Sequence, residues 1–412
     1  MIPLNDNITG DRWTPAFPTG PAGLYIHIPF CLKKCLYCDF YSQTDTSIIQ
    51  GFMDALTREM EFWKNAPLEF DTIYMGGGTP SIMAPLDIER IIDTAAHWLT
   101  IRSDTEITLE VNPGTASLER LNGYRQAGVN RLNIGIQSFQ DPILRFLGRI
   151  HSAGDAQKAF DDARNACFDN IGLDLIYGVP GQSLDMWRNE LALAIHLKPE
   201  HLSCYCLTYE KGTPLERNLT AGEFQAVSEE LAGEMFDTTW SVLSAAGFEP
   251  YEVSNFARVP HRASTAAERE RYRSRHNTKY WNLTSYLGLG PSAHSFIANR
   301  RHWNHPDLKQ YIRNVLSGQR PIADSETLTR DQQMIEWMYL GLRQTSGIDL
   351  RAFERRFQFS VVDRLASALA PLAAEGLIDF TGDRCHLTQT GMRFLDNITS
   401  QIVCLDLGNL PD

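Results

Sequence analysis

The sequence predicts an α/β protein built around a parallel sheet and followed by a mainly helical C-terminal region. Between residues 22 and 220, short apolar runs alternate six times with amphipathic stretches of three- and four-residue period, the pattern of repeated strand–helix units. The apolar runs suit strands buried on both faces, and glycine or polar residues follow several of them. Such units build either a barrel or an open doubly wound sheet, and both arrangements fit the pattern.

Six strands are expected in this part of the chain, at residues 24–28, 71–75, 106–111, 131–136, 172–177 and 201–207. Helical patterns fill the gaps between them at residues 49–63, 86–98, 117–127, 153–168 and 184–196. We expect these units to form one domain over residues 21–220, after an N-terminal segment of residues 1–20.

The pattern changes after residue 220. A long helix is expected over 223–246, a strand over 248–253 and a charged loop or exposed helix over 257–275, so residues 221–307 are assigned to an extension of the first domain. Residues 308–412 are expected to be mainly helical, with an apolar helix at 333–342. Within them, residues 361–400 predict a helix, a hairpin turning at 381–384 and a last helix that opens at Thr388, an order typical of a winged-helix-like module.

Composition and charge exclude several classes of protein. The chain has 412 residues, of which 43% are hydrophobic, and a net charge of −12. This composition excludes a disordered chain, and the charge argues against a nucleic-acid binder, which needs a basic face. The winged-helix-like module is therefore expected to serve a structural or docking role. No apolar run reaches the roughly 18 residues of a membrane span, and residues 1–20 are polar and proline-rich, so the expected location is the cytoplasm.

Three of the eight cysteines lie in one short segment, Cys31-Leu-Lys-Lys-Cys35-Leu-Tyr-Cys38, directly after the first strand. Three thiolates there can hold three irons of a cubane cluster and leave the fourth iron open to another ligand. The alternative is a structural zinc site with a fourth ligand such as His27. Zinc motifs usually pair two cysteine doublets, and the sequence has no second doublet of that spacing, so the cluster is favoured. Most of the other five cysteines are expected to be core residues.

Glycine and polar residues follow other strands at the same kind of position. Gly76-Gly-Gly-Thr-Pro80 follows the second strand, where the glycines let the backbone approach a ligand closely. Further polar residues close or follow the next strands or lie within them: Glu110, Gln137, Ser138, Arg149 and Asp174. Each alone could be a cap or a paired core group. Because parallel α/β proteins bind ligands at the carboxyl ends of their strands, the set predicts a small-molecule site on the rim that carries the cysteines.

These motifs together resemble the radical S-adenosylmethionine (SAM) superfamily, and more narrowly the oxygen-independent coproporphyrinogen III oxidase family. The resemblance rests on Tyr25-Ile-His-Ile-Pro-Phe-Cys31, the cysteine spacing, Tyr37 and the glycine segment, and it runs from about residue 22 to the C-terminus. It implies a partial (β/α)6 barrel and a [4Fe–4S] cluster on Cys31, Cys35 and Cys38, with SAM bound to the fourth iron through its amino and carboxylate groups. It further implies SAM contacts from Tyr25, Tyr37, Phe40, Gly77, Gly78, Thr79, Glu110, Gln137, Arg149 and Asp174.

The chain differs from the oxidase branch of that family. Phe40 stands where true oxidases carry a further cysteine, and the N-terminal segment is shorter than theirs. Residues 275–281, RHNTKYW, match instead the HNxxYW signature of the sister branch, the heme chaperones. A neutral imidazole can ligate heme iron, and aromatic rings offer apolar area to a porphyrin face. His276, Tyr280 and Trp281 are therefore expected to bind heme, with His294 as a second candidate ligand.

The expected function is a radical SAM heme chaperone, with oxidation of coproporphyrinogen III to protoporphyrinogen IX as the alternative. Whether the chain is also an enzyme stays open, because the cluster half of the site looks complete. The expected cofactors are the cluster, SAM and heme. The resemblance implies recipient hemoproteins or respiratory-chain subunits and an electron donor as partners. Contact with a membrane would go through those partners, and a monomer and a homodimer are both compatible with the sequence.

Overall fold

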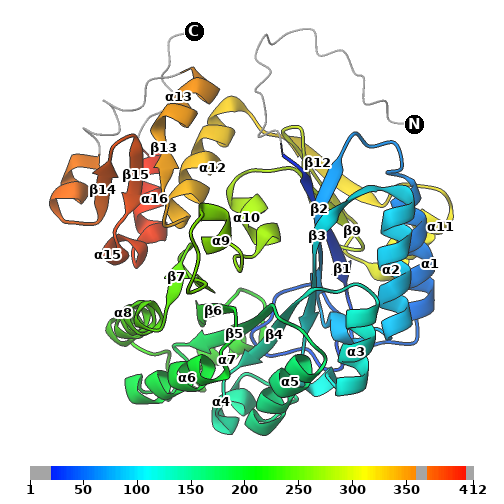
Figure 1. Ribbon diagram of the computed structural model, residues 1–412, viewed down its shortest axis with the longest axis horizontal. Helices are drawn as coiled ribbons and strands as arrows, with labels where there is room; N and C mark the ends of the chain where they lie inside the picture. The colour runs from blue at the N-terminus through cyan, green and yellow to red at the C-terminus, as the bar shows by residue number, and fades with distance from the viewer. Residues whose placement is uncertain (1–19, 359–368, 405–412) are drawn as a thin grey trace.

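A curved sheet whose central strands run parallel forms the body of the computed structural model, which describes residues 20–358 and 369–404. Six neighbouring strands pair in chain order: β1 (Ala22–Ile28), β2 (Glu69–Gly77), β3 (Thr100–Val111), β4 (Arg131–Gln137), β5 (Ile171–Tyr177) and β6 (His201–Cys206). The helices between them are α1 (Ile49–Glu61), α2 (Pro85–Trp98), α3 (Leu118–Gln126), α4 (Asp141–Phe146), α5 (Ala153–Asn165) and α6 (Leu184–Leu197), with short 3-10 turns η1 (Pro80–Ile82) and η2 (Pro113–Thr115). These helices lie along the outer side of the curved sheet (Figure 1), and the six predicted strand–helix units are confirmed.

Local sequence explains why these elements begin and end where they do. In β5 every residue except Asp174 is buried, as expected for a strand covered on both faces. Ser152 and Asp155 form a capping box at the start of α5, which satisfies amide groups that have no partner within the helix. Lys198 adopts a left-handed conformation with φ of 57° and ends α6 before β6 begins.

Further strands extend the sheet at both ends. Beyond β1 lie β9 (Tyr286–Leu289), β10 (His294–Ile297), β11 (Arg300–Asn304) and β12 (Ile322–Thr327), and beyond β6 lie β8 (Asn255–Arg258) and β7 (Phe248–Pro250). The helices of this region are α7 (Pro214–Thr220), α8 (Glu229–Ala245), α9 (Ala266–Arg269), α10 (Arg275–Trp281) and α11 (Leu308–Leu316). Within the described residues, β12 and β7 are the two edges of the sheet, so the strands form the partial barrel that the resemblance implies and do not close it.

Several elements differ from the sequence prediction. The helix expected over 223–246 begins only at Glu229, because Ser228 caps it. The strand expected over 248–253 is limited to β7. The region after residue 308 is mainly helical, as predicted, but β12 pairs antiparallel with β11 and continues the large sheet past the boundary expected between residues 307 and 308. The charged segment 257–275 forms the end of β8, the short exposed helix α9 and the start of α10.

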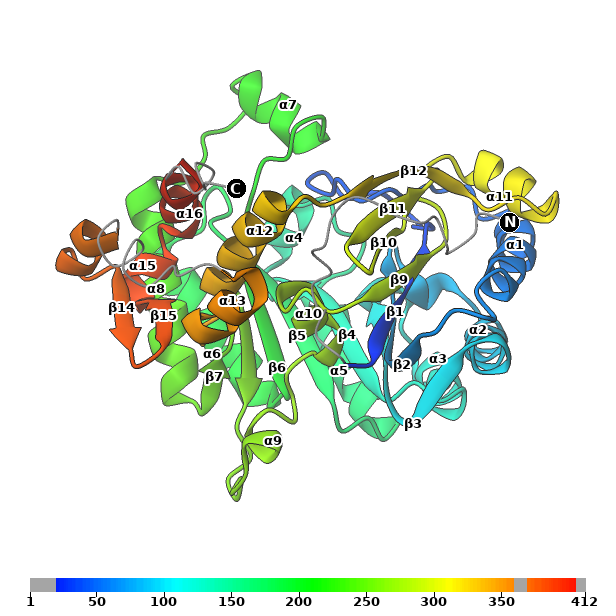
Figure 2. The ribbon, with the colours of Figure 1, turned by 90° about the horizontal axis from the view of Figure 1, so that it is seen from above.

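A small C-terminal module completes the described chain. It comprises α12 (Arg330–Arg343), β13 (Ile348–Asp349), α13 (Leu350–Phe357), β14 (Ile378–Thr381), β15 (Arg384–Leu387), α15 (Gln389–Met392) and α16 (Leu395–Cys404). The predicted hairpin is confirmed, because β14 and β15 pair antiparallel and β13 joins them in a three-stranded sheet. Figure 2 shows this module beside α8, where Arg393 pairs with Asp237 at 3.0 Å. Residues 1–19 and part of the helix expected near residue 361 lie outside the described residues.

In the described part of the chain, the helices are all too short or too polar to cross a membrane.

Candidate radical SAM site

The cysteine loop is anchored directly above the strand ends. After β1, the Cys31 amide donates to the Gln43 carbonyl at 2.9 Å, which folds the loop back on itself. Leu36 makes backbone hydrogen bonds to two other segments. Its amide donates to the Leu147 carbonyl at 3.2 Å, and its carbonyl accepts from the Leu215 amide at 3.0 Å. The loop is therefore fixed by three separate parts of the chain and not by its own residues alone.

The three thiols are free and receive hydrogen bonds suited to thiolates. Thr79 donates to Cys31 Sγ at 3.5 Å, and Arg149 Nη1 donates to Cys35 Sγ at 3.4 Å. Burial raises the pKa of Cys38 to about 11 in the metal-free protein, so a bound metal must supply the charge that stabilises its thiolate. Hydrogen bonds to the ligating sulfurs are among the protein's means of tuning an iron–sulfur cluster. The loop thus fits the cluster that the sequence predicts.

The zinc alternative fits the loop less well. His27, its proposed fourth ligand, is buried, with Nδ1 bonded to the Tyr25 hydroxyl at 3.1 Å and Nε2 to the Tyr41 carbonyl at 2.9 Å. Among the described residues, no three cysteine, histidine or acidic side chains converge on one point that could hold a single ion. Structural zinc needs four ligands around one point, whereas the ligands of a cubane cluster are spread over several irons.

The glycine segment wraps around the start of the cysteine loop. The Gly78 amide donates to the Ile28 carbonyl at 2.8 Å, and the Thr79 amide donates to the Phe30 carbonyl at 2.7 Å. Gly77 has φ of +110°, and a Cβ atom on Gly78 would lie 2.6 Å from the Phe30 carbonyl oxygen. Only glycine allows this approach, so the two segments are built as one unit.

Two half-buried carboxyl groups face the same site from two strands: Glu110 near the end of β3 and Asp174 in the middle of β5. Burial raises the pKa of Glu110 to about 7, although the Tyr74 hydroxyl donates to its carboxylate at 2.8 Å. Burial likewise raises the pKa of Asp174 to about 6, although Asn133 Nδ2 donates to it at 2.6 Å. Asp174 Oδ1 has no hydrogen-bond partner in the described chain. Carboxyl groups with raised pKa values and an open oxygen are typical of a ligand site.

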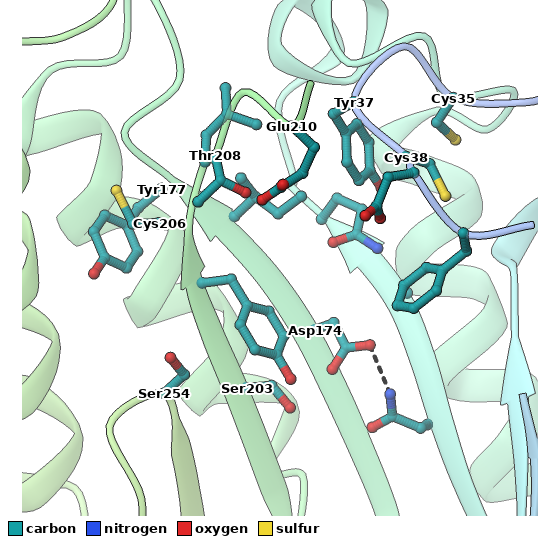
Figure 3. A pocket seen from close by; sticks show the side chains of 18 of the residues that line it. Cys35, Tyr37, Cys38, Asp174, Tyr177, Ser203, Cys206, Thr208, Glu210 and Ser254 are labelled. Atoms are coloured by element: carbon teal, nitrogen blue, oxygen red, sulfur yellow. Dashed lines mark hydrogen bonds between the residues drawn. The ribbon is translucent and has the colours of Figure 1, made fainter. Parts of the chain in front are cut away.

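The three thiols, the end of the glycine segment and the two carboxyl groups line one cavity of about 1010 Å³. Figure 3 shows Cys35 and Cys38 on the loop at one side, Asp174 and Ser203 on the strands below, and Tyr177 and Cys206 at the opposite side. The sequence-predicted residues that line the cavity are Cys31, Cys35, Cys38, Tyr37, Phe40, Gly77, Gly78, Thr79, Glu110, Gln137, Arg149 and Asp174. Phe40 is 62% exposed. Tyr25 does not line the cavity, because its hydroxyl points to His27 inside the barrel.

Other lining residues escaped the sequence prediction. Ser203 and Cys206 lie on β6 and could have been found in the same way as Asp174, as polar or thiol side chains on a strand of the predicted sheet. Residues 392–397 of the C-terminal module and Arg343 of α12 also line the cavity. The sequence carries no local signal for these contacts, because tertiary packing alone brings the module to the mouth of the barrel.

Of the HNxxYW residues, Asn277 lines the cavity, whereas His276, Tyr280 and Trp281 do not. His276 is 1% exposed, and its two ring nitrogens bond to the Thr72 and Tyr280 hydroxyls, each at 2.8 Å. Tyr280 packs edge-on against Tyr286, and Trp281 packs against Tyr251. Heme ligation by His276 therefore requires that one hydrogen bond breaks and that the ring leaves the interior of the barrel. His294, in contrast, is exposed and stacks on Trp303, with ring centroids 5.6 Å apart.

Comparison with known proteins agrees with this geometry. Residues 25–194 match the radical SAM superfamily, and residues 328–394 match the HemN C-terminal domain. The heme chaperone HemW of Bacillus subtilis is 34% identical over 371 residues, which are 89% of this chain and 95% of the relative. The mitochondrial radical S-adenosyl methionine domain-containing protein 1 of Danio rerio is 34% identical, with 81% and 75% of the two chains covered. The solved coproporphyrinogen III oxidase HemN of Escherichia coli superposes with a TM-score of 0.80 at 25% identity, with 93% and 90% covered.

Proposed function

Because the chain belongs to the HemW family of the radical SAM superfamily, we propose that it holds a [4Fe–4S] cluster and SAM in its cavity, binds heme and delivers it to other proteins. The observation that carries the cofactor half of this proposal is that three free thiols, a glycine turn and two half-buried carboxyl groups line one cavity. The heme half rests on the relatives named as heme chaperones.

In the proposed site, Cys31, Cys35 and Cys38 hold the cluster. When bound, the cluster supplies electrons to SAM. Arg149 orients two groups of the loop, since its Nη1 atom lies 3.4 Å from Cys35 Sγ and 3.5 Å from the Tyr37 hydroxyl while Nη2 donates to the Gly135 carbonyl at 2.8 Å. The remaining groups proposed to contact SAM are Phe40, Gly77, Gly78, Thr79, Glu110, Gln137 and Asp174.

The carboxyl groups suit the cationic parts of SAM. Glu110 and Asp174 are half-buried, and with pKa values of about 7 and 6 each of them can lose its proton near neutral pH. An incoming positive charge favours their ionised forms, because an opposite charge within a few ångströms lowers the pKa of a carboxyl group. Binding of SAM in the cavity is therefore expected to be linked to release of protons from this pair.

For heme, we propose His294 as the iron ligand. Its ring is exposed beside Trp303, whereas the ring of His276 is enclosed and bonded at both nitrogens. A neutral imidazole can ligate the iron, and partial desolvation of the ring, together with the nearby Arg301 cation, lowers the pKa of His294, which favours that neutral form. The indole of Trp303 offers apolar area to a porphyrin face.

The test is anaerobic reconstitution of the full chain with iron and sulfide, followed by heme titration. We expect a Soret shift that saturates in the wild type and in His276→Ala and that is lost in His294→Ala. A shift that is lost only in His276→Ala would contradict the assignment of His294 while leaving heme binding itself in place.

A second candidate function is oxidation of coproporphyrinogen III, which the superposition on HemN favours. Phe40, in place of the cysteine expected in the oxidase branch, argues against it. The two functions are separated by incubating reconstituted protein with coproporphyrinogen III, SAM and a reductant. Formation of protoporphyrinogen IX would identify an oxidase, and absence of turnover alongside heme binding supports the chaperone.

We further propose a cytoplasmic location, with recipient hemoproteins or respiratory-chain subunits and an electron donor as partners. Transfer of bound heme to an apo-hemoprotein, followed by absorption spectra after separation of the two proteins, tests the delivery step. Heme that stays with the chaperone in every mixture would contradict it.

A further inference from the structure

His276 lies behind the wall of the cofactor cavity, against the ring of Tyr74. Tyr74 stacks on His276 with ring centroids 5.1 Å apart and an interplanar angle of 28°. The same Tyr74 lines the cavity, and its hydroxyl donates to Glu110 Oε1 at 2.8 Å. Tyr74 therefore links the histidine of the HNxxYW motif to a carboxylate proposed to contact SAM.

The position of the His276 ring is fixed on both sides. Thr72 on β2 bonds Nδ1, and Tyr280 on the same helix α10 bonds Nε2, each at 2.8 Å. Rotation of the ring would break both hydrogen bonds in a buried environment, where leaving a polar group unpaired is unfavourable. Helix α10 is itself held to the barrel, because Lys279 and Arg275 each pair with Asp71 at 2.7 Å.

The stack also has little free space. A Cβ atom on Gly76 would lie 3.0 Å from the Tyr74 ring and 3.1 Å from the Glu110 carboxyl group. A Cβ atom on Gly23 would lie 3.0 Å from the His276 ring. Backbone thus closes around the three side chains at two glycines, so a change in the position of His276 is transmitted to Tyr74 and Glu110.

We propose that His276 is a positioning residue for the SAM site: its ring fixes Tyr74, and the Tyr74 hydroxyl fixes the Glu110 carboxylate. The inference rests on the proposed function, because Glu110 contacts SAM only there. It assigns the histidine of the motif to cofactor binding and leaves the heme iron to another residue.

The test measures the dissociation constant of SAM by calorimetry on cluster-reconstituted full-length variants. Loss of one buried hydrogen-bonded group is expected to weaken SAM binding about tenfold in His276→Ala and in Tyr74→Phe, with the iron content unchanged. His276→Gln keeps an amide that can bond Thr72 or Tyr280 and should recover most of the affinity. His302→Ala removes another buried histidine, which stacks on Trp63 away from the cavity, and should leave SAM affinity unchanged.

A second perturbation leaves the stacked side chains intact. Gly23→Ala pushes on the His276 ring from β1 and should weaken SAM binding in the same direction, which keeps the inference testable if His276→Ala does not fold. Unchanged SAM affinity in Tyr74→Phe and Gly23→Ala, with wild-type protein binding SAM, would overturn the inference alone. Failure of cluster-loaded wild-type protein to bind SAM would instead contradict the proposed function.

Discussion

Two groups of polar side chains lie inside the partial barrel, and they differ in how their atoms are hydrogen-bonded. At the carboxyl ends of the strands, Asp174 Oδ1, Arg149 Nε and Ser42 Oγ have no hydrogen-bond partner in the described chain. Near the beginnings of β1 and β2, His276 uses both ring nitrogens and Asp71 pairs with two cations. Since buried polar groups are normally paired, the open atoms that line the cavity are available to a ligand, although Arg131 Nε and His201 Nδ1 near the beginnings of β4 and β6 are open as well.

The largest effect is expected from a substitution in the cysteine loop, at the carboxyl ends of the strands. Cys35→Ala removes one of three proposed cluster ligands, so iron and sulfide content and the broad iron–sulfur absorption should fall to background after reconstitution. Cys167→Ala is the matched control, because Cys167 is free and exposed outside the cavity. Equal iron and sulfide in the two variants would show that the ligand assignment is wrong.

A substitution near the beginnings of the strands, where Asp71 lies, is expected to lower the free energy of unfolding. Asp71→Ala leaves the ammonium of Lys279, whose side chain is only 10% exposed, without its ion pair, and should lower the free energy of unfolding by about 3 kcal/mol. Asp185→Ala, which breaks an exposed pair with Arg188, should cost at most about 1 kcal/mol. Urea denaturation of the metal-free variants measures both values. Equal losses would contradict the view that the ion pairs of Asp71 support the barrel.

Glu110 lines the cavity and is linked through Tyr74 to His276 on the other side of the barrel wall. Its titration should make the free energy of unfolding depend on pH. Its pKa is raised from 4.5 to about 7 in the folded protein, so the folded state holds this proton more tightly than the unfolded chain. The resulting stability is fully present below pH 4.5 and is lost as the pH rises through about 7. Glu110→Gln cannot titrate, so its melting temperature should fall less than that of the wild type between these two pH values.

The control for this comparison is Glu119→Gln on the exposed surface of α3, which should keep the pH dependence of the wild type. If Glu110→Gln keeps it as well, Glu110 is not the group that carries the effect.

The smallest effect on stability is expected at Phe40. Its side chain is 62% exposed, so Phe40→Ala should change the free energy of unfolding by less than about 0.5 kcal/mol. Because Phe40 lines the cavity, the same variant should still weaken SAM binding measurably. A large loss of stability without a change in SAM affinity would place Phe40 in the support and not in the site.

The residues of the cavity could be located from the sequence, whereas the buried contacts of His276 could not. Apolar strands followed by cysteines, glycines and carboxylates are visible in order along the chain, and the strand-end rule then places them on one rim. His276 is held in the interior by a hydrogen bond with Thr72, which lies 204 residues away in the sequence, so no local pattern predicts this contact. β12 was missed for a related reason: Ile322-Ala-Asp-Ser-Glu-Thr327 is polar and mostly exposed, and only its pairing with β11 makes it a strand.

The central claim is that the cysteine loop and the open strand ends form one cofactor site. Calorimetric titration of SAM into cluster-loaded and cluster-free wild-type protein tests it most directly. The account predicts saturable binding of one SAM per cluster in the loaded protein and much weaker binding in the cluster-free protein. SAM binding of equal affinity in both preparations, or none in the loaded protein, would contradict it.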